Sequence, residues 1–108
     1  MKADQLPIEK RIASLADLAI KCGKKEACEN SFGYSLETKL KGERVELFYH
    51  EGKIDLNFYM DSKCGTIHID NLRQIRNFSN YEKLDNLNKA TRILEENAYN
   101  FCKNPNIC

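Results

Sequence analysis

The chain has no tryptophan, only two prolines and five glycines among its 108 residues, and no long apolar run. A membrane-spanning helix needs about 18 consecutive apolar residues, so we expect no membrane span. Neither sign of charge is in excess, since 17 Lys and Arg stand against 16 Asp and Glu. A nearly neutral chain has no overall field to attract nucleic acid or an anionic membrane. With 31% charged and 42% hydrophobic residues, residues 1–108 have the composition of one soluble globular domain.

The sequence also lacks the short motifs that identify common cofactor sites. It contains no phosphate-binding loop, dinucleotide-binding fingerprint, zinc-protease helix motif or EF-hand loop. We therefore expect no nucleotide cofactor and no metal cofactor. Residues 1–5 lack the apolar segment of a signal peptide, so we expect either a cytosolic protein or the mature form of an exported one.

Two tight turns, Lys41-Gly42 and Glu51-Gly52, set the register of three predicted strands. Counting outward from the first turn pairs Leu36 with Leu47, and counting outward from the second pairs Leu47 with Leu56. The neighbouring pairs on this face are also apolar, and a slip of one residue would expose them all. The predicted strands are residues 32–40, 43–50, 53–60 and 65–70, and residues 61–64 form a longer turn before the last.

Apolar residues spaced three and four apart predict two helices. The first runs from about Pro7 to Cys22, and residues 24–31 follow it as a polar connection. The second begins at the capping box formed by residues 79–82 and ends at Asn104-Pro105. Residues 71–77 fit either a helical turn or an irregular return. The economical architecture is a two-layer α+β fold, in which the N-terminal and C-terminal helices pack on one face of a four-stranded antiparallel meander.

The other face of this sheet is left uncovered, and it mixes charged with aromatic side chains. Charges of both signs would repel phosphates in places and are better suited to a protein partner. The candidate partner-binding residues are Arg44, Phe48, His50, Lys53, Asp55, Tyr59 and His68. We therefore expect a non-enzymatic protein-binding domain, such as a small inhibitor or a toxin-immunity protein. A homodimer through the same face is a further option.

Two alternative functions use residues of the same face. Single-stranded nucleic acid would stack on Phe48 and Tyr59. A small ribonuclease would use His50 and His68 as general acid and base. His50 and His68 lie on predicted strands that are separated by a third strand. Since neighbouring strands are about 4.8 Å apart, the two imidazoles should be about 10 Å apart or more. A pair of Cys64 with His68 lacks a third, orienting residue. We therefore assign no catalytic residue and expect a binding protein rather than an enzyme.

Cysteines are numerous for a cytosolic domain, with five in the chain. Four of them form two equally spaced pairs and are the disulfide candidates: Cys22, Cys28, Cys102 and Cys108. We expect Cys102 to bond Cys108 or, alternatively, a cysteine at the end of the first helix, which leaves Cys64 unpaired. Zinc is less favoured because its ligand pairs are spaced more tightly, and buried free thiols are the remaining alternative. Disulfides favour export to the periplasm or the extracellular space over the cytoplasm.

Overall fold

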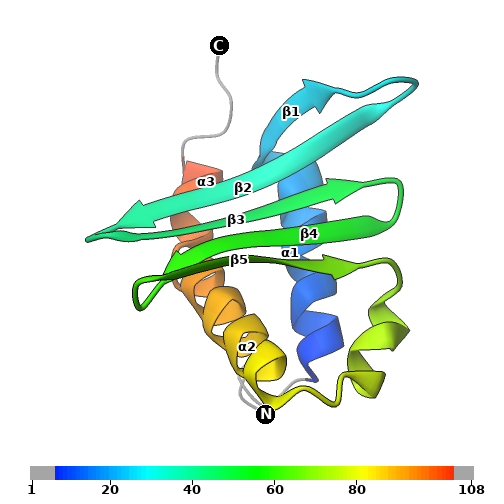
Figure 1. Ribbon diagram of the computed structural model, residues 1–108. Helices are drawn as coiled ribbons and strands as arrows, with labels where there is room; N and C mark the ends of the chain where they lie inside the picture. Colours follow the sequence, from blue (N-terminus) through cyan, green and yellow to red (C-terminus); the bar gives the residue numbers. More distant parts are fainter. Residues whose placement is uncertain (1–6, 104–108) are drawn as a thin grey trace.

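The computed structural model describes residues 7–103, apart from the side chains of residues 40, 76, 77, 99, 102 and 103. A helix precedes an antiparallel meander of five strands, and a 3₁₀ helix and two further helices follow it (Figure 1). The elements are α1 (Ile8–Cys22), β1 (Lys24–Ala27), β2 (Phe32–Leu40), β3 (Glu43–His50), β4 (Lys53–Met60), β5 (Lys63–Ile69), η2 (Leu72–Asn77), α2 (Tyr81–Glu96) and α3 (Ala98–Lys103). Within residues 7–103, no helix is long and apolar enough to cross a membrane.

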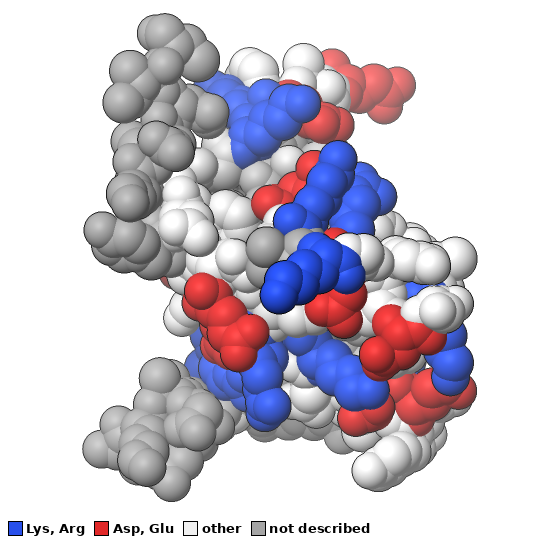
Figure 2. Space-filling view, turned by 90° about the vertical axis from the view of Figure 1, so that its left-hand side faces the viewer, with Lys and Arg blue, Asp and Glu red and all other residues white. Residues whose placement is uncertain are grey.

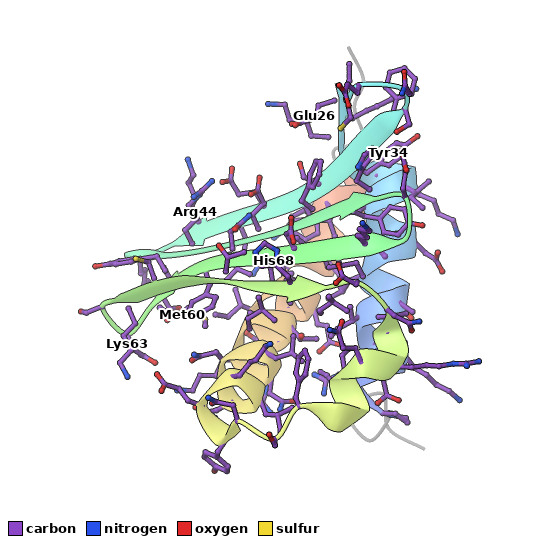
Figure 3. All side chains as sticks on the ribbon, turned by 45° about the vertical axis from the view of Figure 1, so that its right-hand side comes forward. Glu26, Tyr34, Arg44, Met60, Lys63 and His68 are labelled. Atoms are coloured by element: carbon purple, nitrogen blue, oxygen red, sulfur yellow. The ribbon has the colours of Figure 1, made fainter. Side chains whose placement is uncertain are left out.

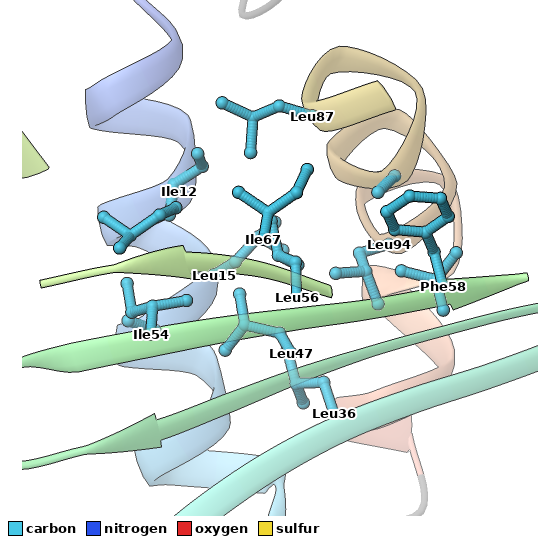
Figure 4. Packing of buried hydrophobic residues seen from close by; sticks show 14 of the residues in the cluster. Ile12, Leu15, Leu36, Leu47, Ile54, Leu56, Phe58, Ile67, Leu87 and Leu94 are labelled. Carbon is cyan, nitrogen blue, oxygen red and sulfur yellow. The ribbon is translucent and has the colours of Figure 1, made fainter. Parts of the chain in front are cut away.

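One hydrophobic core joins the helices to the sheet. Leu36, Leu47 and Leu56 lie opposite one another on β2, β3 and β4, which confirms the registers predicted from the two turns. All three are at most 1% exposed, and they pack in one cluster with Ile12 of α1 and Leu87 of α2 (Figure 4). Both helices lie on this side of the sheet (Figure 1). The other side of the sheet is therefore free of helices in the described part of the chain.

The fifth strand, β1, was not predicted. Three of residues 24–27 are charged and all four are exposed, so their pattern resembles a loop. They form a strand because they pair antiparallel with Phe32–Ser35. The chain enters this strand through Gly23, where an added Cβ would lie 2.4 Å from the carbonyl oxygen of Ser35. Glycine is needed at this close approach between the end of α1 and β2.

The turn before β5 is also shorter than predicted. Asp61 and Ser62 form a two-residue loop with left-handed backbone (φ 53° and 62°), and β5 begins directly after it at Lys63. The two predicted turns have the same conformation, with φ of 85° at Gly42 and 81° at Gly52. Because the third loop contains no glycine, its sequence did not indicate a tight turn.

The C-terminal helical region differs from the prediction at its cap and in being divided into two helices, the second of which runs to Lys103. Asn80, rather than the predicted capping box, caps α2, and its side chain accepts a hydrogen bond from the amide of Lys83 at 2.9 Å. The helix ends at Glu96, and Asn97 separates it from α3. Residues 71–77 contain the 3₁₀ helix, so the helical alternative was the correct one there.

Candidate functional site: the open face of the sheet

The surface without helices, here called the open face, consists of the outward-directed side chains of β2 to β5. Figure 3 shows these side chains projecting from the sheet on the side opposite the helices. They are Glu37, Lys39, Arg44, Glu46, Phe48, His50, Lys53, Asp55, Asn57, Tyr59, Cys64, Thr66 and His68. Every residue predicted to bind a partner lies on this face.

The register sorts the predicted residues into separate groups. Phe48 lies opposite Asp55, which in turn lies opposite His68, so these three form one row across β3, β4 and β5. Arg44 lies opposite Tyr59 in another row, four residues along β3 from Phe48. At about 3.4 Å per residue, the two rows are on the order of 13 Å apart. The open face therefore has two distinct aromatic positions rather than one aromatic cluster.

Cross-strand hydrogen bonds hold the polar side chains between these rows. Arg44 Nε donates to Glu37 Oε2 at 2.5 Å. Asn57 Nδ2 donates to Glu46 Oε1 at 3.0 Å, and Thr66 Oγ1 donates to Asn57 Oδ1 at 2.7 Å. Each charge or amide in this network has a partner on the next strand, so the surface offers few unpaired charges to a phosphate backbone.

Phe48 has a structural role in addition to its place on the open face. An added Cβ at Gly33 would lie 2.3 Å from Cζ of Phe48, so the ring rests directly on the backbone of this glycine. An aromatic ring that covers a glycine on a neighbouring strand shields the backbone and stabilises the strand pair. The ring centroid is also 6.3 Å from that of His50. Phe48 is half-buried, whereas Tyr59 is 45% exposed.

His50 is engaged in a contact that sequence reasoning missed. Its Nε2 lies 2.7 Å from Ser31 Oγ, and Ser31 Oγ donates to Glu51 Oε1 at 2.9 Å. Because the hydroxyl has a single proton and that proton points to Glu51, Nε2 of His50 must donate to Ser31. In this arrangement Nε2 cannot accept a proton from the serine. The contact therefore ties the loop before β2 to the β3–β4 turn and does not activate a nucleophile.

His68 is arranged differently. Its Nδ1 lies 2.5 Å from Asp55 Oδ1, and 71% of its side-chain surface is exposed. The carboxylate orients the ring and leaves Nε2 towards solvent. However, His50 lies opposite Lys53 at the end of β3, with β4 between it and the strand of His68. The structure does not bring the two histidines together as an acid–base pair.

The cysteines are only partly as predicted. Cys22 is disulfide-bonded, and Cys64 carries a free thiol, as expected for the unpaired residue. Cys28, predicted as a disulfide candidate, is also free, and its sulfur lies against Gly33 rather than against another cysteine. The disulfide predictions for Cys102 and Cys108 concern side chains outside those that the structure describes. Within the described residues no group of three His, Cys, Asp or Glu side chains could hold a metal ion.

A second feature is a hollow of about 460 Å³ between α2 and the β4–β5 turn. Figure 2 faces this side of the molecule and shows Lys and Arg interleaved with Asp and Glu. Lys89 Nζ lies 3.3 Å from a carboxylate oxygen of Asp61 and of Asp85, and hydrogen bonds to these two groups raise the pKa of Lys89. The pair with Asp61 links the turn to α2, and the pair with Asp85 lies within the helix, so three of the charges that border the hollow are paired with one another.

Searches of protein-family models, of curated proteins and of solved structures found no significant match to this chain.

Proposed function

We propose that the chain is a non-enzymatic protein-binding domain that holds its partner on the open face. The observation that carries this proposal is the Arg44–Tyr59 pair on a sheet surface that no described helix covers. Tyrosine and arginine are enriched in protein interfaces, where they supply much of the binding energy. Small inhibitors and toxin-immunity proteins are examples of this class of function.

The charges of the open face favour a protein over a nucleic acid. Three basic residues (Lys39, Arg44 and Lys53) are interspersed with three acidic ones (Glu37, Glu46 and Asp55). Nucleic-acid surfaces need an excess of positive charge to displace counterions from the phosphates. A surface of alternating sign instead offers a protein partner complementary contacts in a defined orientation.

The test compares two exposed tyrosines. Tyr59 lies on the open face, and Tyr81, at the start of α2, is 84% exposed and lies away from it. A partner captured by the immobilised wild-type protein should be retained by Tyr81→Ser and lost by Tyr59→Ser. With the purified partner, calorimetry should show that Tyr59→Ser weakens binding by about tenfold or more, which corresponds to about 1–2 kcal/mol.

Equal affinities of the wild type, Tyr59→Ser and Arg44→Ser for that partner would overturn the proposal. A partner that proves to be nucleic acid, with an affinity that falls steeply as salt rises, would also overturn it. Light scattering of the protein alone reveals whether the partner on the open face is a second copy of the chain.

A further inference from the structure

The sheet has two edges, and the one formed by β1 is a short strand of four residues, three of them charged. β1 pairs with Phe32–Ser35 and so covers the first part of β2. The remaining part of this edge presents the charged residues Glu37 and Lys39, which oppose the addition of a strand. β5 pairs with β4 along its whole length, Lys63–Ile69, and no described strand pairs with its other side. It contains neither proline nor a bulge, so it is a regular edge of seven residues.

The β4–β5 turn determines which backbone groups of β5 are free. Met60 and Lys63 flank the two-residue loop and face each other, so they form a hydrogen-bonded pair. Because hydrogen-bonded and non-hydrogen-bonded pairs alternate, every second residue from Lys63 onward directs its N–H and C=O towards β4. The intervening residues, Cys64, Thr66 and His68, direct theirs to the open edge. Three donors and three acceptors therefore lie in line, without strand partners.

A hollow of about 330 Å³ lies directly beside this edge. Gly65 and Ile67 of β5 border it on the sheet side, and Asn80, Lys83 and Asn86 at the start of α2 border it on the helix side. Figures 1 and 3 show that the first turns of α2 and the 3₁₀ helix continue past β5, on the side away from β4. The helical layer is thus wider than the sheet, and a sixth strand would have helices beneath it.

We propose that this edge binds an extended peptide segment of a partner protein as a sixth strand. Main-chain hydrogen bonds to Cys64, Thr66 and His68 would supply affinity, as in other cases of strand addition. Alternate side chains of the peptide would point into the hollow, where the ring of Phe58 packs over Gly65 and offers an apolar contact to an aliphatic group. Because Cys64 and Thr66 carry no charge, and Glu82 and Lys83 on the rim are one of each sign, a neutral peptide fits best.

A second copy of this chain is the other possible occupant, and the helical layer argues against it. Two copies joined edge to edge would each carry an overhanging α2 and 3₁₀ helix. These overhangs would compete for the space beneath the joined edges, whereas a single strand leaves it free. The edge offers the backbone of Cys64, Thr66 and His68, whereas the proposed function is carried by the side chains of Arg44 and Tyr59 on β3 and β4, so the two proposals can fail independently.

The test uses amide hydrogen exchange and a defined probe. In the free protein the amides of Cys64, Thr66 and His68 should exchange quickly, and those of Gly65 and Ile67 slowly. The probe is a soluble peptide of about seven alternating threonine and valine residues, the length of an ordinary strand. Its addition should slow exchange at the first three amides by about tenfold or more at saturation, and the amides of Glu37 and Lys39 should not change. The same peptide with N-methyl groups on alternate residues is the control.

A matched pair of variants isolates one backbone donor. Thr66→Pro removes the outward N–H without removing a bond to β4, and Gly65 before it tolerates the proline ring. Thr66→Val retains the N–H and loses the same side-chain bond to Asn57. Thr66→Pro should bind the peptide about tenfold more weakly than Thr66→Val. If Thr66→Pro does not fold, the N-methylated peptide provides the same comparison.

Three results would overturn the proposal. The first is the absence of binding at millimolar peptide while the three amides exchange freely. The second is equal binding of the methylated and unmethylated peptides. The third is protection of these amides in the absence of peptide, if that protection increases with protein concentration. This result would identify a second copy of the chain as the occupant.

Discussion

Replacing Ser62 by glycine should stabilise the protein, because Ser62 has a backbone conformation that glycine adopts without strain. Its φ of 62° is close to those of Gly42 and Gly52 at the same position of the other two turns. The left-handed conformation costs a residue other than glycine about 1–2 kcal/mol. Glycine loses more entropy on folding, which offsets about 0.5–1 kcal/mol of that gain. The expected net stabilisation is about 0.5–1 kcal/mol.

Urea and thermal unfolding measure this change. With a slope of about 1–2 kcal/mol per molar urea, the midpoint should rise by about 0.5 M while the slope stays constant. The melting temperature should rise by about 3–6 °C. The reverse change, Gly52→Ser, is the matched control, because no atom lies within 4 Å of the position of an added Cβ. Its cost is therefore purely conformational, and it should destabilise by a similar amount. If Gly52→Ser destabilises and Ser62→Gly does not stabilise, the third turn does not have the left-handed conformation and the reasoning is refuted.

Three further predictions concern the core, the open face and the thiols. Leu47 is fully buried opposite two other leucines, so Leu47→Ala should lower the free energy of unfolding by about 2–5 kcal/mol in urea titrations. A loss below 1 kcal/mol would contradict its central place in the core. Phe48→Ala should destabilise by about 1–3 kcal/mol because it uncovers Gly33, and an unchanged melting temperature would show that the ring serves binding alone. A thiol reagent on the native protein should label exposed Cys64 quickly and half-buried Cys28 slowly, and it should label Cys22 only after reduction; immediate labelling of Cys22 would contradict its disulfide.

Most of the sheet could be predicted because the features that determine its strands and turns lie close together in the sequence. Alternating apolar residues with a period of two, together with glycine at the second turn position, fix both the buried face and the register of β2, β3 and β4. The third turn was not predicted because its left-handed positions hold Asp61 and Ser62. These residues adopt the conformation here, but unlike glycine they do not indicate it in the sequence. As a result, the start of β5 was placed two residues too late.

The candidate site was predictable in its location and less so in its contacts. Successive side chains of a strand point to opposite faces of the sheet, and this alternation placed all seven predicted residues on the open face. The alternation does not predict that Phe48 covers Gly33 or that His50 donates to Ser31. These contacts join residues of different segments, and no periodic pattern in the sequence relates them. The same limit applies to the cysteines, since equal spacing in the sequence did not place Cys28 beside a partner sulfur.

By itself, the sequence determined which side chains enter the core and how the central strands pair, since turn chemistry and alternation act between neighbours along the chain. Only the tertiary structure decided where the sheet ends. β1 is a strand because β2 lies beside it, although its four exposed residues, three of them charged, carry no strand pattern. β5 keeps a free edge because the segment after it turns into a helix and joins the other layer instead of adding a strand. Edges arise from long-range pairing and from the packing of whole layers, and no local pattern of residues encodes either of them.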